Sequence, residues 1–180
     1  MGLWRFQINA ALEHPDPVGR QTAQTLRDFG IRGVRTVRSA KIYLIDLPDI
    51  LNSKLTQRIA EDLLCDPVVE RFVIHGQDQP IEEPAECLPI EVHFKPGVMD
   101  NVANSTLLAL EDMGIKARSV RTARRFELSP PPSDAELRRI PRLLGNDCIQ
   151  EVIIGTRPIT PQPQPPRYDF KLRTVSIRDL

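Results

Sequence analysis

The alternation of apolar and polar side chains predicts strands and helices in turn along the first part of the chain. Residues 4–12 alternate with a period of two, which predicts a strand with one buried face. Apolar residues recur at helical spacing over 18–29. Asp16 is placed to cap this helix, followed by a first-turn proline, and Gly30 is placed to end it.

The pattern continues with a second strand, helix and strand. Residues 34–47 are rich in Val, Ile, Thr and Tyr and predict one bent strand or two joined strands. A helical stripe over 55–63 leads into a last strand at 68–74. This order is that of a split βαβ, ferredoxin-like unit, so we predict an α+β fold.

The same pattern then occurs a second time. At a constant offset Asp16 pairs with Asp100 and Gly30 with Gly114, and one residue less aligns residues 37–41 with 120–124. Such a repeat predicts two copies of one small fold related by an approximate twofold axis. In the second copy Pro141 lies inside its second helix and predicts a kink or a restart.

The sequence allows more than one packing of the two copies. Both helices of a ferredoxin-like unit cover one face of its sheet, yet residues 43–47 are apolar on both sides of their strand. We therefore expect the two sheets to pack face to face. Edge-to-edge pairing into one long sheet is the competing arrangement. On the expected strand at 90–94, His93 is predicted to point outward.

Composition divides the chain into two repeats and two connectors. The predicted repeats are residues 1–76 and 90–155. Residues 77–89 combine prolines with glutamates, as expected of an extended linker. Residues 156–180 begin with a proline-rich stretch and end in an alternating segment. This tail predicts either continuation into a longer polypeptide or docking on a partner.

Charge and cysteine content restrict the class of protein. The 24 basic and 24 acidic residues give a net charge of zero, which disfavours general nucleic-acid binding. No apolar run approaches the roughly 20 residues of a membrane span. The 3 cysteines suit a reducing cytoplasm better than a disulfide framework.

No catalytic, cofactor-binding or metal-binding constellation stands out, so partner binding is the main expectation. The strand-entrance cations Arg38, Lys41, Arg121 and Arg124 are the best candidates. Residues three apart on a strand point to opposite faces, so a shared ligand requires a bend. Solvated rims, structural ion pairs and direct substrate contact are the alternatives. The acidic positions Glu70 and Glu151 are expected to pair with these cations across the twofold axis.

Three motifs carry a family resemblance over nearly all of residues 4–75. Asp16-Pro17-Val18-Gly19, Val37-Arg38-Ser39-Ala40-Lys41 and the segment 63–70 (LLCDPVVE) occur in the expected order and spacing. Together they resemble PurS, the small subunit of phosphoribosylformylglycinamidine (FGAM) synthase. The second copy has weaker versions, and its residues 95–100 are similar to the N-terminal domain of the fused, large form of this enzyme.

The resemblance implies a function in purine synthesis. It implies a dimeric, non-catalytic adaptor between a glutaminase (PurQ-type) and a synthetase (PurL-type) subunit or domain, with a homodimer also possible. ATP, Mg and glutamine are then used by those partners, and this chain has no cofactor of its own. A tandem repeat in one chain reproduces such a dimer, as does the N-terminal domain of the large enzyme.

The sequence gives less support to two other functions. An ACT-like sensor of amino acids requires glycine in the loop between first strand and first helix, and only the loop at 96–99 has one. A binder of single-stranded RNA requires aromatic residues on its sheet, but only 5% of residues are aromatic.

Overall fold

The computed structural model describes residues 2–48, 53–77, 79–83, 85–161 and 170–172. The first half of the chain contains β1 (Gly2–Ala10), α1 (Pro17–Asp28), β2 (Thr36–Leu47), α2 (Ser53–Ile59), the π-helical turn η1 (Ala60–Leu64) and β3 (Glu70–Gly76). The predicted order is therefore confirmed, and residues 36–47 form one strand rather than two. Gly30 has a φ of 79°, which suits the predicted glycine after the helix.

The second half repeats this order. It contains β4 (Leu88–Phe94), α3 (Asn101–Asp112), β5 (Ser119–Ser129), α4 (Asp134–Leu137), α5 (Ile140–Leu144) and β6 (Gln150–Ile154). The predicted restart near Pro141 is confirmed, because α4 ends at Leu137 and α5 begins at Ile140. Pro141 lies in the first turn of α5, where its missing N–H removes no helical hydrogen bond.

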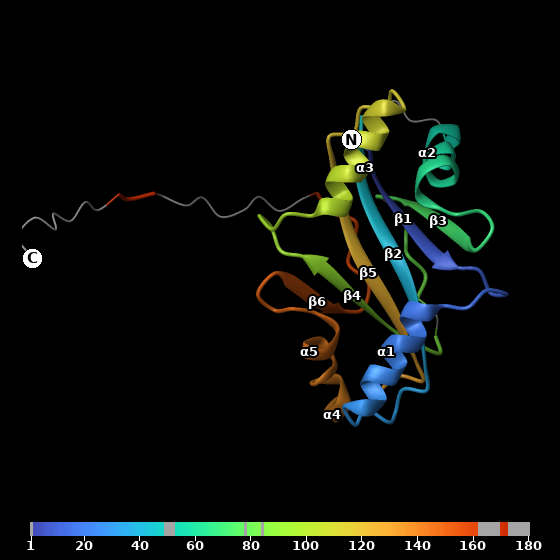
Figure 1. Cartoon of the computed structure of the whole chain (residues 1–180), viewed down its shortest axis with the longest axis vertical. Coiled ribbons are helices and arrows are strands. Elements are labelled where there is room, and N and C mark those ends of the chain that lie inside the picture. The colour runs from blue at the N-terminus through green and yellow to red at the C-terminus, as the bar shows by residue number, and fades with distance from the viewer. Residues whose placement is uncertain (1, 49–52, 78, 84, 162–169, 173–180) are drawn as a thin grey trace, which may run out of the picture.

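All the strands of the described residues form one antiparallel sheet in the order β3-β1-β2-β5-β4-β6 (Figure 1). The two halves join edge to edge through β2 and β5, which pair from Thr36 opposite Ser129 to Asp46 opposite Ser119. Our expectation of two sheets packed face to face is therefore wrong. The long β2–β5 pairing satisfies the backbone hydrogen-bonding groups that an edge strand would otherwise leave open.

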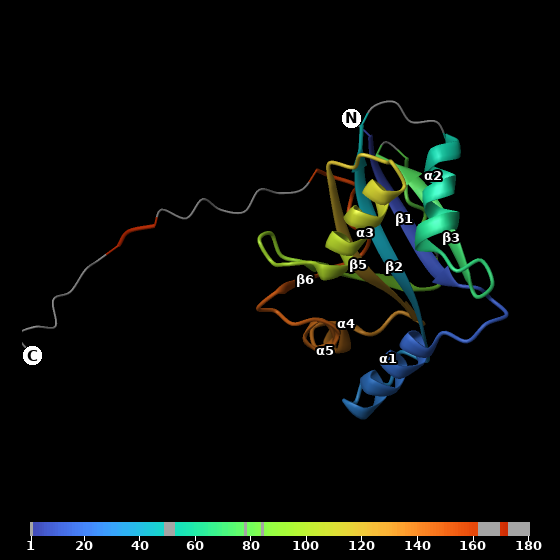
Figure 2. The ribbon, with the colours of Figure 1, turned by 45° about the horizontal axis from the view of Figure 1, so that its top comes forward.

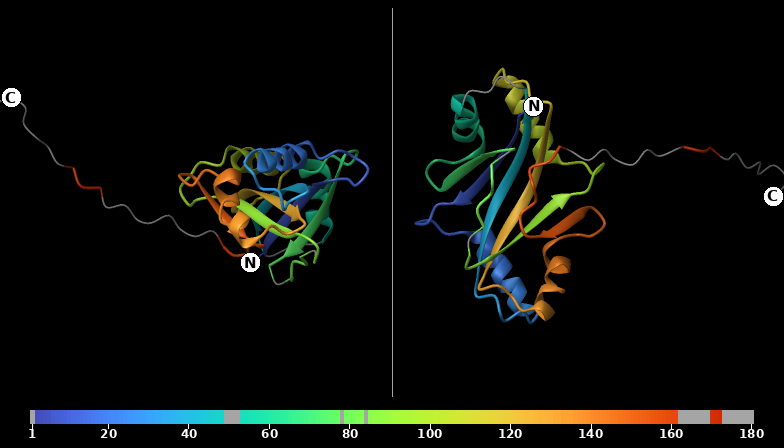
Figure 3. Two further views of the ribbon diagram at one scale, coloured as in Figure 1. Left: turned by 90° about the horizontal axis from the view of Figure 1, so that it is seen from below. Right: turned by 180° about the vertical axis from the view of Figure 1, so that it is seen from behind.

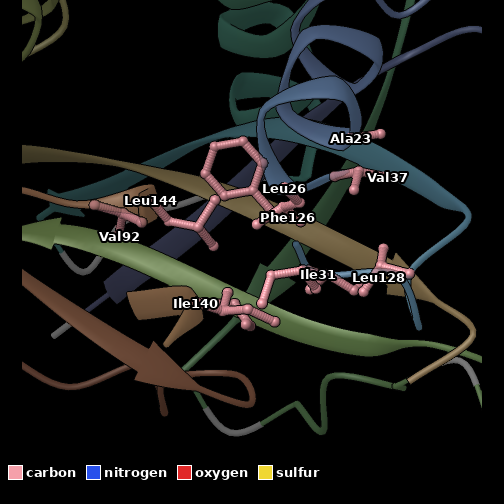
Figure 4. Close-up of a cluster of buried hydrophobic side chains, with 11 residues drawn as sticks. Ala23, Leu26, Ile31, Val37, Val92, Phe126, Leu128, Ile140 and Leu144 are labelled. Carbon is pink, nitrogen blue, oxygen red and sulfur yellow. The ribbon is translucent and has the colours of Figure 1, made fainter. Parts of the chain in front are cut away.

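The hydrophobic cores are shared between the halves. Leu26 of α1 packs with Phe126 and Leu128 of β5 and with Ile140 of α5 (Figure 4). Thus α1 from the first half covers strands of the second half. Helices α1, α4 and α5 lie at one end of the sheet, and α2 and α3 lie at the other (Figure 2).

The opposite end of the sheet has the converse arrangement. Leu110 of α3 packs with Phe6 and Ile8 of β1, and Ile59 of α2 belongs to the same cluster. Both helices that carry an aspartate cap, α1 and α3, therefore contribute to the core of the other half. Neither half encloses its own apolar surface, so the described residues between 2 and 161 form one folded unit.

The face of the sheet without helices is covered in part by the two connectors (Figure 3, right). After β6, Ile159 is buried and Thr156 hydrogen-bonds to Arg125 of β5. His93, which we expected to point outward to solvent, lies on this face and is only 4% exposed. The expectation was wrong because strand alternation assigns a face but does not show what covers it.

The C-terminal tail lies mostly outside the described residues. Of the alternating residues expected there, Tyr168 is not described, and Phe170 and Leu172 are exposed and belong to no strand. Among the helices that the structure describes, none is long and apolar enough to cross a membrane.

Candidate functional site

Two aspartates fix the starts of the main helices against the central strands. Asp16 accepts hydrogen bonds from the Gly19 N–H at 2.7 Å and from the Ser39 hydroxyl at 2.8 Å. Asp100 likewise accepts from the N–H and the hydroxyl of Thr122, both at 2.8 Å. Each carboxylate thus caps a helix and also holds the strand that carries the candidate cations.

Close packing explains why Gly19, in the first motif, is a glycine. A Cβ atom added to Gly19 would lie 2.3 Å from the carbonyl oxygen of Val37. The start of α1 therefore approaches β2 too closely for a side chain at this position.

Lys41 and Arg124 lie at the centre of the helix-covered face. They are directly opposite each other in the β2–β5 pairing. Lys41 Nζ lies 2.6 Å from Glu70 Oε1, and the guanidinium of Arg124 lies 5.8 Å from the centroid of the Phe126 ring. About half of the Lys41 side chain is exposed. This pair is therefore accessible between the N-termini of α1 and α3.

Arg38 and Arg121 lie on the other face of the sheet. Arg38 is opposite Glu127 in the β2–β5 pairing, and Arg121 is opposite Leu44. Arg121 donates a hydrogen bond of 2.6 Å to the carbonyl oxygen of Thr160. The prediction that cations three residues apart face opposite sides is thus confirmed, and the four cations do not form one cluster.

The predicted acidic pairing holds only in part. Glu70 pairs with one of the candidate cations, Lys41, but within its own half and not across the axis. Glu151 pairs at 2.9 Å with Arg157, which is not one of the four candidates. In the turns before β3 and β6, Glu70 accepts from Asp66 N–H and Gln150 from Asn146 N–H. Gln150 therefore occupies the place of Glu70. The alignment of Glu151 with Glu70 was therefore wrong by one residue. A shift of one residue turns a side chain to the other face of a strand.

A cavity with charged side chains lies beside each capping aspartate. The first has a volume of about 600 Å³ and is lined by Asp16, Lys41 and Glu70 together with apolar side chains such as Val18 and Val69. The second has a volume of about 300 Å³ and is lined by Asp100 and by Lys95, Arg118, Arg121 and Arg157. The first cavity suits apolar contacts and the second suits an anion.

A buried ionic cluster on the face without helices was not predicted. The Glu91 carboxylate lies 2.7 Å from the guanidinium of Arg5, 3.2 Å from that of Arg125 and 2.8 Å from His93 Nε2. All four residues are at least 95% buried. The sequence pattern places these four residues on the polar side of strands that have one buried face. Nothing in the pattern shows that the connectors cover this side.

The cluster also holds the chain after β6. Glu91 Oε2 accepts from the Arg157 N–H, and Arg125 donates to Thr156 Oγ1 at 2.6 Å. Burial by itself raises the pKa of Glu91, but the hydrogen bond from His93 and the charge of Arg5 outweigh it and lower this pKa to about 2. Glu91 therefore stays ionised and acts as a structural counterion.

The described residues contain no group of three or more His, Cys, Asp or Glu side chains arranged to hold a metal ion. The expectations about catalysis and cofactors stay predictions. The geometry of the described residues provides an accessible pair of cations, Lys41 and Arg124, and a cavity beside each capping aspartate.

The fold places the chain among α+β proteins with ferredoxin-like strand and helix order and an antiparallel sheet. Residues 9–78 match the family model described as PurS: Phosphoribosylformylglycinamidine (FGAM) synthase. Residues 9–78 are thus similar to the PurS family, and this similarity supports a role in purine biosynthesis. No curated protein gives a significant match.

Proposed function

We propose that the chain is a non-catalytic adaptor module of FGAM synthase that bridges the glutaminase and synthetase parts. The match of residues 9–78 to the PurS family carries this proposal. ATP, Mg and glutamine are used by the partner parts, and this module supplies the surface on which they assemble. In keeping with the family, we place its action in the cytoplasm.

The proposed module is a covalent counterpart of a PurS dimer, with two repeats about a pseudo-twofold axis. The β2–β5 register supports this. Lys41 faces Arg124, its own counterpart in the sequence repeat, as expected at a symmetry axis. Val37 faces Leu128, and the counterpart of Val37, Val120, faces Ile45. The exchange of α1 and α3 between the cores also fits a dimer joined into one chain.

The partner-binding surface is proposed to lie on the helix-covered face around Lys41 and Arg124. Val18 at the start of α1 is 46% exposed, and Val102 at the start of α3 is 53% exposed. Apolar side chains at matching positions on both sides of two cations form a surface that suits a protein partner. Accessible charges of this kind mainly alter association rate and salt dependence.

The test is assembly of the full chain with the synthetase and the glutaminase, followed by size-exclusion chromatography with light scattering. We expect a ternary complex that the Lys41→Glu, Arg124→Glu double variant weakens at least tenfold. Lys116→Glu, an exposed charge in the α3–β5 loop, serves as control and leaves the complex intact. Light scattering of the chain alone tests the possible homodimer.

Two results would overturn the proposal. One is the absence of any complex with either partner under conditions in which those partners are active. The other is stabilisation by a free amino acid in thermal shift assays without partner binding, which would replace the adaptor by the ACT-like sensor.

A further inference from the structure

The basic cavity beside Asp100 has a defined structural origin. Strand β4 pairs with β5 only as far as His93 opposite Ala123. Beyond this point the chain of β4 turns away toward Lys95, while β5 extends back to Ser119. The gap between the two strand ends, bordered by α3, is the cavity of about 300 Å³.

The side chains that line this cavity carry an excess of positive charge. Lys95, Arg118, Arg121 and Arg157 face a single carboxylate, Asp100. Both oxygens of Asp100 are already used, since Oδ1 accepts from a backbone N–H of α3 and Oδ2 accepts from β5. Asp100 is thus committed to capping α3 and offers little further neutralisation.

Two of the four cations have no ion pair among the described residues. Arg118 lies 3.5 Å from Asp46, and Arg157 is paired with Glu151. Lys95 and Arg121 instead donate to the backbone carbonyls of Asp147 and Thr160. Burial, and the charge of Arg157 next to it, lower the pKa of Arg121.

We propose that this cavity binds the phosphate group of a small phosphorylated molecule. The guanidinium groups of Arg121 and Arg157 offer planar donors that match phosphate oxygens, and Lys95 adds a third charge. The volume lies at the lower end of the range of small-molecule sites, which is about 300–1,000 Å³. A bound phosphate relieves the repulsion between the two arginines.

The first half of the chain provides a matched control. Arg38 precedes Ser39, the partner of Asp16, as Arg121 precedes Thr122, the partner of Asp100. The corresponding cavity has about 240 Å³, and Arg38 is the one Lys or Arg side chain among the described residues that line it. Arg38→Gln therefore removes an equivalent charge without touching the proposed site.

The experiment is isothermal titration calorimetry of the full chain at an ionic strength of about 20 mM, at which charges are weakly screened. The probes are inorganic phosphate and ribose 5-phosphate, with ribose and succinate as neutral and carboxylate controls. We expect saturable binding of one phosphate probe per chain, tighter than either control. Preference for ribose 5-phosphate assigns a phosphate ester, and equal affinity assigns free phosphate.

Variants decide whether the binding belongs to this cavity. Arg121→Gln and Arg157→Gln should each weaken phosphate binding at least tenfold, and Arg38→Gln should leave it within twofold. Circular dichroism identifies any variant that fails to fold, in which case the other arginine variant decides. Loss of binding in Arg38→Gln equal to that in Arg121→Gln overturns the proposal, as does equal binding of succinate.

This site is independent of the adaptor function, and the same variants separate the two. Arg121→Gln should still form the complex with the synthetase and the glutaminase. If the wild-type chain binds no phosphate probe and Arg121→Gln loses the complex, the cavity is a protein contact and the proposal is wrong.

Discussion

Lys41 of β2 lies directly opposite Arg124 of β5, so the pairing that joins the two halves places two cations side by side. Like charges in this position are destabilising unless something offsets them. Here Glu70 binds Lys41 at 2.6 Å, and Arg124 lies over the Phe126 ring. The stability of the junction between the halves therefore depends in part on the carboxylate of Glu70 at the start of β3.

Glu70→Gln tests this relationship. The amide oxygen can still accept from Asp66 N–H, as Gln150 does from Asn146, so only the charge is lost. We expect the free energy of unfolding to fall by about 0.5 kcal/mol at low salt, with a smaller loss at high salt. Urea denaturation at two salt concentrations measures this. Asp62→Asn, which removes an exposed pair with Arg58, is the control, and an equal effect in both variants would contradict us.

Leu26→Ala tests the sharing of cores between the halves. Leu26 is fully buried and packs on strands of the second half, so its truncation should cost about 2–5 kcal/mol. Because each core contains both halves, chemical denaturation should still show one transition by fluorescence and by circular dichroism. Leu108→Ala removes a side chain that is 63% exposed and should change stability by less than about 0.5 kcal/mol. Two separate transitions would show that the halves fold independently.

Glu136 should make stability depend on acid pH. Its carboxylate accepts from Gly33 N–H and from the Ser133 hydroxyl and N–H, and these bonds lower its pKa to about 2. A carboxylate with a lowered folded pKa stabilises the protein above its ordinary value of 4.5, and this stabilisation is lost as the pH falls toward 2. Glu136→Gln should therefore flatten the pH dependence of the melting temperature between these values.

The control for this measurement is Glu111→Gln, an exposed carboxylate on α3. It should leave the acid part of the curve unchanged. Glu91 has a lowered pKa of the same size, so Glu136→Gln removes part of the dependence and not all of it. An unchanged curve in Glu136→Gln would show that the bond between the halves at Gly33 does not form in solution.

Among substitutions that remove one charge, we expect Glu91→Gln to lower the free energy of unfolding the most. It leaves the guanidinium groups of Arg5 and Arg125 buried without their shared counterion, which typically costs about 3–5 kcal/mol. Glu127→Gln removes a partly exposed partner of Arg125 and should cost much less. Equilibrium unfolding in urea compares the two variants. Equal losses would contradict a special role of the buried carboxylate.

The elements were predictable because their signals are local. The caps at Asp16 and Asp100, the glycine after α1 and the restart at Pro141 each depend on residues within a few positions. The opposite orientation of Arg38 and Lys41 also followed from strand geometry alone. We did not predict that Gln150, rather than Glu151, occupies the place of Glu70, because the two aligned segments differ in length.

By itself, the sequence determined the order of strands and helices, the repeat of that order, the PurS resemblance and the opposite orientation of Arg38 and Lys41 on their strand. Only the tertiary structure decided how the halves meet. Both face-to-face and edge-to-edge packing bury apolar residues of β2, and the β2–β5 hydrogen bonds that separate them join residues far apart in the chain. The same distance in sequence hid the burial of Glu91 and the gathering of Lys95, Arg121 and Arg157 around one cavity.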